Sequence, residues 1–89
     1  MQSLFEILGR RWALRIVWEL RESALSSRAL AARCGGVSPT VLHKRLRELR
    51  DAKIVELLAG EGYELSSRGS TLVDAMRPLE RWAGSWLGG

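Results

Sequence analysis

Residues 38–50 read SPTVLHKRLRELR, and this stretch decides the predicted fold. Ser38 suits the N-cap of a helix, and Pro39 suits its first position, where the missing N–H is not needed. Three leucines follow at spacings of four and three, which places them on one side of a helix: Leu42, Leu46 and Leu49. We therefore expect a helix over about 38–50 with one buried side.

The opposite side of this helix is cationic. Thr40, Lys44 and Arg47 lie at its centre and His43 and Arg50 flank them, whereas Arg45 lies beside the leucines and is expected in a surface salt bridge. Lys and Arg can bind guanine O6 and N7 in a major groove about 12 Å wide, and a capped helix N-terminus favours phosphate. We predict DNA contact, with solvent exposure as the alternative, for Ser38, Thr40, His43, Lys44, Arg47 and Arg50. Because the chain has no Asn and its only Gln is Gln2, base readout should centre on guanine.

Three shorter helices are predicted before this segment. The first covers 4–8 behind the cap Ser3 and is apolar around most of its circumference, so it must be buried or lie in an interface. The second covers 11–22, and the third covers 28–33 behind Ser26 or Ser27. Residues 34–37, which contain two glycines, form the turn before residue 38.

A small hairpin over about 54–65 and a last helix over about 68–87 follow. Ser66 or Ser67 is the predicted cap of that helix, and Pro78 should kink it. This order is that of a mainly α fold with a small β-hairpin, the winged helix-turn-helix. Residues 1–89 would be a single domain, with a recognition helix at 38–50 and a wing at 54–65.

Composition and charge favour some classes of protein and exclude others. The chain has 89 residues, 46% hydrophobic and 27% charged, with a net charge of +4. Residues 1–53 carry 11 basic and 5 acidic side chains, whereas residues 54–89 carry 3 and 5, so the basic part suits a polyanion. One Cys and one His exclude an internal disulfide framework and a Cys/His zinc site. We expect a soluble, cytoplasmic protein with no membrane span and no cofactor. We expect no enzyme either, since no nucleophile–base pair is visible.

Several short motifs resemble one family. They are Leu8-Gly9-Arg10-Arg11-Trp12 with Glu19-Leu20, Gly36-Val37-Ser38-Pro39 with Leu42, Arg45-Leu46-Arg47-Glu48-Leu49, and Tyr63-Glu64-Leu65 followed by Gly69 and Trp82. Over about residues 7–82 the chain resembles the HxlR family of bacterial winged-helix transcriptional regulators, within the MarR-like group. The resemblance implies a dimeric DNA-binding repressor or activator. The helix at 38–50 would enter the major groove, and the first and last helices would pair two subunits.

The sequence departs from that family in two places. Many members carry a thiol-sensing Cys just before the first helix, but residues 1–3 hold none, so this role is not carried over. Cys34 is expected to pack as a small apolar residue. The wing is short and carries Glu56, Glu61 and Glu64, which argues against insertion into the minor groove. Arg68, just after the wing, is the better candidate for a phosphate contact.

The predicted partners are double-stranded DNA and a second copy of the chain. Core or dimer interface is expected for Phe5, Leu8, Leu72, Met76, Leu79, Trp82 and Trp86. A two-fold dimer would place its recognition helices about 34 Å apart, so we expect a near-palindromic operator. We expect the dimer to act there as a repressor. The alternative is a winged-helix protein–protein interaction module without DNA binding. The sequence identifies no effector, although a space between the dimer helices and the DNA-binding part would suit a small apolar ligand.

Overall fold

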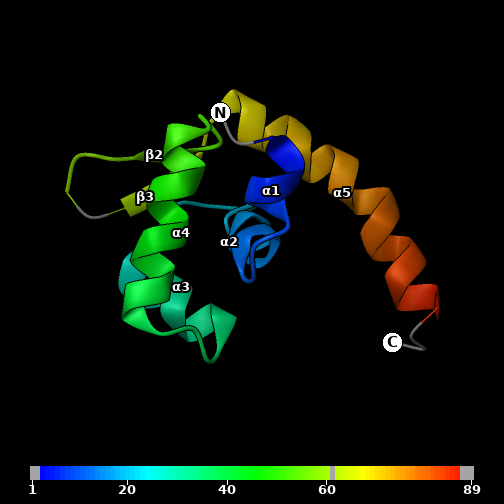
Figure 1. The fold of residues 1–89 in the computed structure, drawn as a ribbon, viewed down its shortest axis with the longest axis horizontal. Coiled ribbons are helices and arrows are strands. Elements are labelled where there is room, and N and C mark those ends of the chain that lie inside the picture. Colours follow the sequence, from blue (N-terminus) through cyan, green and yellow to red (C-terminus); the bar gives the residue numbers. More distant parts are fainter. Residues whose placement is uncertain (1–2, 61, 87–89) are drawn as a thin grey trace.

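The computed structural model describes residues 3–60 and 62–86, with side chains as far as residue 84. Its elements follow in the order α1 (Leu4–Leu8), α2 (Ala13–Glu19), β1 (Leu25–Ser26), α3 (Ser27–Cys34), α4 (Pro39–Asp51), β2 (Val55–Leu57), β3 (Gly62–Leu65) and α5 (Ser67–Trp86). Figure 1 shows α4 and the strands at one side of α2, and the second half of α5 projecting at the other. The predicted mainly α winged-helix fold is confirmed.

The first helix matches its prediction and the second is shorter than predicted. α1 covers 4–8, and the Ser3 hydroxyl accepts the Glu6 N–H at 3.2 Å. α2 begins at residue 13 instead of 11, because Trp12 has a left-handed φ of 79° that a helix cannot continue. It ends at residue 19 instead of 22, since the Arg21 N–H bonds the Trp18 carbonyl in a tighter turn.

The helix-turn-helix consists of α3, a glycine turn and α4. The Ser26 hydroxyl caps α3 by accepting the Ala29 N–H, so the helix covers 27–34 rather than 28–33. Gly35 and Gly36 follow with φ of 63° and 139°, values that glycine adopts at little cost. Ser38 then caps α4 as predicted, accepting the Val41 N–H at 3.2 Å.

α4 ends in a Schellman motif with an unusual residue. The Ile54 N–H bonds the Leu49 carbonyl and the Lys53 N–H bonds the Arg50 carbonyl, both at 2.9 Å. The residue in the left-handed position of this motif is usually glycine. Here it is Lys53, with φ of 65°.

The predicted hairpin is confirmed as β2 and β3, and a third strand that was not predicted completes the sheet. β3 lies between β1 and β2, and both pairs are antiparallel. The extra strand, β1, pairs Leu25 with Tyr63 and Ser26 with Gly62. Two residues give no alternating pattern, and Ser26 also caps α3, so the sequence indicated the cap and not the strand.

α5 is the long helix after the wing. Of the two predicted caps Ser66 is the one used, since its hydroxyl accepts the Gly69 N–H at 3.0 Å. The helix covers 67–86 and continues through Pro78, and the predicted end at Leu87 lies outside the described residues. Figure 1 shows the second half of α5 turning and leaving the body of the protein, consistent with the backbone bond that Pro78 removes.

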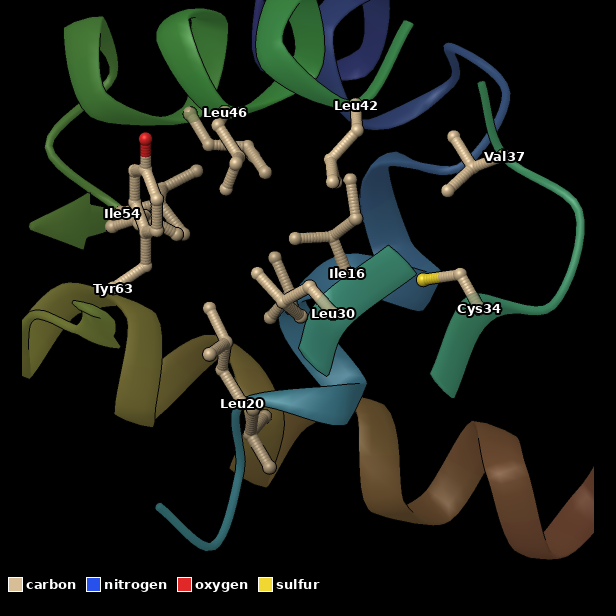
Figure 2. Packing of buried hydrophobic residues seen from close by; sticks show 13 residues of the cluster. Ile16, Leu20, Leu30, Cys34, Val37, Leu42, Leu46, Ile54 and Tyr63 are labelled. Atoms are coloured by element: carbon tan, nitrogen blue, oxygen red, sulfur yellow. The ribbon is translucent and has the colours of Figure 1, made fainter. Parts of the chain in front are cut away.

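The core lies between α2, α3, α4 and the sheet. The predicted stripe of α4 is buried, with Leu42, Leu46 and Leu49 at most 2% exposed. Figure 2 shows Leu42 and Leu46 pointing toward Ile16 of α2 and Leu30 of α3. Burying such side chains contributes about 1.5–3 kcal/mol each. This packing fixes which side of α4 faces solvent.

Candidate nucleic-acid interface

The side of α4 opposite its buried leucines is open to solvent. All six residues of this helix and its cap that were predicted to contact DNA are exposed: Ser38, Thr40, His43, Lys44, Arg47 and Arg50. The Ser38 hydroxyl is engaged with the Val41 N–H. The Ser38 side chain therefore also caps the N-terminus of α4.

Ion pairs divide the cations of the chain into two groups. Within the described part of the chain, six arginines lie within 4.0 Å of a carboxylate: Arg10, Arg15, Arg21, Arg33, Arg45 and Arg77. Among the described side chains, no carboxylate lies within that distance of the other eight cations: Arg11, Arg28, Lys44, Arg47, Arg50, Lys53, Arg68 and Arg81. Five of these eight lie on the outer side of α4 or beside its C-terminal end, namely Lys44, Arg47, Arg50, Lys53 and Arg68, and this surplus of positive charge suits an anion.

Arg45 and Arg47 are separated by one residue, but Arg45 makes contacts within the chain whereas Arg47 is exposed to solvent. Arg45 turns inward: its Nε donates to the Arg11 carbonyl at 2.9 Å and its Nη1 to Glu48 Oε1 at 3.1 Å. Its predicted salt bridge is confirmed. Arg10 Nε lies 3.4 Å from the other oxygen of Glu48, without hydrogen-bond geometry. These contacts tie the segment before α2 to α4, while Arg47 stays exposed.

Arg68 lies at the base of the wing, where α5 begins. Its Nη1 donates to the Ala52 carbonyl at 3.2 Å, so the guanidinium is held beside the end of α4. Lys53 is exposed in the same region and was not predicted as a site residue. Its left-handed φ could not have been read from the sequence, because that conformation favours Gly or Asn.

The wing is short and acidic. Glu56 of β2 is paired in register with Glu64 of β3, and like charges directly opposite each other are unfavourable. Gly60 turns the chain with φ of 99°, and Glu61 lies outside the described residues. Carboxylates at these positions would repel phosphates, so the wing does not extend the basic surface of α4.

The residues predicted for the dimer interface fall into two groups. Phe5 is 87% exposed, Leu79 57% and Trp82 60%. Leu8, Leu72 and Met76 are half-buried and pack against the core of the same chain, and the side chain of Trp86 lies outside the described residues. Beside α1 and α5 is an apolar cleft of about 490 Å³, lined mainly by Leu4, Ile54, Leu72 and Ala75.

Cys34 is a core residue. It is buried beside Ile16 and Val37 (Figure 2). Burial raises the pKa of its thiol; Arg15 lowers that pKa and Glu19 raises it further. A protonated, buried thiol is a weak nucleophile, in keeping with the predicted packing role.

Residues 3–60 and 62–86 contain no group of three or more metal-ligating side chains. No helix within these ranges combines the length and the apolar character needed to cross a membrane.

Comparisons with known proteins agree with this geometry. The family model of the HxlR-like helix-turn-helix matches residues 7–89. The chain is 27% identical over 92 residues to an uncharacterized HTH-type transcriptional regulator, YvaP of Bacillus subtilis, covering 97% of this chain and 85% of that protein. It is similar to quinone-bound YodB of B. subtilis, with TM-score 0.83 and 27% identity over 91% of this chain and 90% of that one.

A third comparison shows the fold alone. It is a possible HxlR family transcriptional factor from Thermoplasma volcanium, with TM-score 0.88 and 22% identity over 99% of this chain and 84% of that one. Together with the family match and the exposed cationic side of α4, these similarities establish what kind of protein this is. The chain belongs to the HxlR-like helix-turn-helix family and is a DNA-binding transcriptional regulator.

Proposed function

We propose that the chain works as a homodimer, that it reads a near-palindromic operator through α4, and that it represses transcription. One observation carries the proposal. The outer side of α4 presents exposed cations with no described carboxylate within 4.0 Å, while Arg45 on the inner side is held by Arg11 and Glu48. Surface cations kept clear of acids suit phosphates and base edges.

Individual roles follow from side-chain chemistry. Arg47 and Lys44 would bind guanine O6 and N7, with Arg47 making two bonds, and Thr40 would contact a thymine methyl group. The phosphate contacts fall to the residues around them: Ser38, His43, Arg50 and Arg68. Cytoplasmic action follows from a chromosomal DNA ligand in a bacterial-type regulator.

Exposed apolar side chains support the homodimer. None of the five residues of α1, all of them described, is buried, and Leu4 and Phe5 are exposed. Leu79 and Trp82 are exposed on the half of α5 that projects from the body in Figure 1. Such side chains gain stability when a second copy covers them. Two-fold pairing through α1 and α5 would set the two α4 helices about 34 Å apart.

The proposed repression follows from the length of promoter DNA that a bound dimer would cover. A dimer that contacts two half-sites about 10 base pairs apart covers enough DNA to exclude another protein from a promoter. Transcription in vitro from a promoter that overlaps the bound site should therefore fall as the protein is added. A rise in transcript would assign activation instead.

Selection from a random duplex library tests the whole proposal. The expected result is two inverted half-sites about 10 base pairs apart, each with a guanine facing α4. Sedimentation of the complex should give two chains per duplex. Selected sites without inverted symmetry, or half-sites without guanine at these positions, would refute the proposed mode of readout.

A further inference from the structure

A groove of about 770 Å³ lies where the end of α4, β2 and the beginning of α5 meet. Four cations from three segments line it: Arg47 and Arg50 from α4, Lys53 from the following turn, and Arg68 from α5. Two serines at the start of α5, Ser66 and Ser67, also line the groove. The groove is continuous with the outer side of α4 through Arg47 and Arg50.

Lys53 lines the groove in a backbone conformation that is unfavourable for lysine. Lys53 occupies the left-handed position of the Schellman motif, where a residue with a Cβ is disfavoured relative to glycine. Ser66 Oγ donates to the Lys53 carbonyl at 2.6 Å, which fixes this turn against α5. Glycine or asparagine would adopt this backbone conformation more easily, so the stability of the turn does not explain the choice of lysine.

We propose that this groove clamps a phosphate of the DNA backbone beyond the bases that α4 contacts, in place of a wing that enters the minor groove. The proposal rests on the proposed function, since α4 must first place the protein on DNA. Two carboxylates, Asp51 and Glu56, also line the groove. With Arg47 assigned to guanine, the other three cations exceed these carboxylates by one positive charge. That excess suits one phosphodiester.

The contact between the groove and a phosphate should not depend on the base sequence of the DNA. A backbone clamp raises affinity for every duplex equally, and each phosphate contact contributes about 0.9 to the slope of log K against log salt. Removing one clamp cation should therefore lower this slope without changing the ratio of affinities for the selected and a scrambled duplex. Loss of a base contact would change that ratio.

The test uses Lys53→Asn and Arg50→Gln in the full chain. Asn tolerates the left-handed backbone, so Lys53→Asn should fold and melt at or above the wild-type temperature. Titrations at 50 and 200 mM salt should show the slope reduced by about 0.9 per bound copy. Arg81→Gln is the matched control, since Arg81 is an exposed cation of α5 about 20 Å further along the helix. Its slope should equal that of the wild type.

Two outcomes would overturn the clamp. One is wild-type slopes for both Lys53→Asn and Arg50→Gln, with the wild type still binding its selected duplex; the proposed function would then stand without the clamp. The other is saturable binding of pyrophosphate in the absence of DNA that Lys53→Asn abolishes, again with an unchanged slope. The groove would then be a site for a small phosphate compound. Failure of the wild type to prefer any duplex would instead refute the proposed function.

Discussion

The hydroxyl of Ser66 donates to the backbone carbonyl of Lys53 at 2.6 Å, which joins the start of α5 to the end of α4. Arg68 adds a second link by donating to the Ala52 carbonyl at 3.2 Å. The helix proposed to pair two chains is thereby fixed to the helix proposed to read DNA. Pairing through α5 would then set the separation of the two α4 helices in the dimer.

This junction leaves no room for a side chain at residue 69. A Cβ there would overlap the Ile54 carbonyl oxygen and lie 3.0 Å from the Leu65 side chain. Gly69→Ala should therefore lower the free energy of unfolding by about 1–3 kcal/mol, measured by urea denaturation. Ser70→Ala, at the next and exposed position, should change it little. Equal stability of Gly69→Ala and the wild type would contradict the packing described here.

Arg45→Ala should affect folding. It removes donors to the Arg11 carbonyl and to Glu48, at a site where the Arg45 side chain is 14% exposed. We expect a loss of about 1–3 kcal/mol in the free energy of unfolding, measured by thermal or urea denaturation. The neighbouring variant Arg47→Ala should melt like the wild type. A full loss of stability in Arg47→Ala instead would mean that α4 is rotated from the orientation described.

The thiol of Cys34 should react slowly. Its pKa is raised, chiefly by burial, so iodoacetamide should label the folded protein much more slowly than the urea-unfolded chain. The folded state holds the thiol proton more tightly than the unfolded state does. The free energy of unfolding should therefore fall as the pH rises above the ordinary thiol pKa, about 8.5.

Cys34→Ala controls for this pH dependence, because it should remove the fall above about pH 8.5. Labelling of the folded wild type at the rate of the unfolded chain would show that the thiol is accessible. That result would overturn its assignment to the core.

The proposed interface should be sensitive to charge on α1 and α5. Phe5→Glu and Trp82→Glu each place a carboxylate where an exposed aromatic ring would be covered by the second copy. Loss of one aromatic anchor costs about 2 kcal/mol of binding, and each substitution removes two anchors from a two-fold dimer, so the dimer dissociation constant should rise at least about 30-fold. Sedimentation equilibrium measures this constant. Leu57→Glu, on the exposed wing, should leave it unchanged; equal effects of all three variants would count against the interface.

Much of the fold could be predicted because strong local signals coincide in it. The segment from Ser38 to Leu49 combines a cap, an N-terminal proline and a leucine stripe, and both the extent and the buried side of α4 agree with prediction. β1 and the ends of α2 could not be predicted. A two-residue strand depends on pairing with β3, and the left-handed Trp12 depends on its tertiary surroundings.

The candidate DNA-binding site likewise contains one part that the sequence predicts and one part that depends on tertiary contacts. Exposure of Lys44 and Arg47 followed from periodicity alone, since the opposite side of α4 is apolar. The groove at the wing base needs three segments to meet, and the part that Lys53 takes in it depends on a left-handed backbone that no local sequence signal marks.

Binding titration of Arg47→Ala against the selected and a scrambled duplex tests most directly whether the outer side of α4 reads DNA. If α4 reads the bases, this variant should melt like the wild type and lose about 1–3 kcal/mol of its preference for the selected duplex. Lys44→Ala, measured in parallel, should weaken binding to at least one duplex. If both variants kept the wild-type affinity and the wild-type preference for the selected duplex, the outer side of α4 would not be the surface that reads DNA.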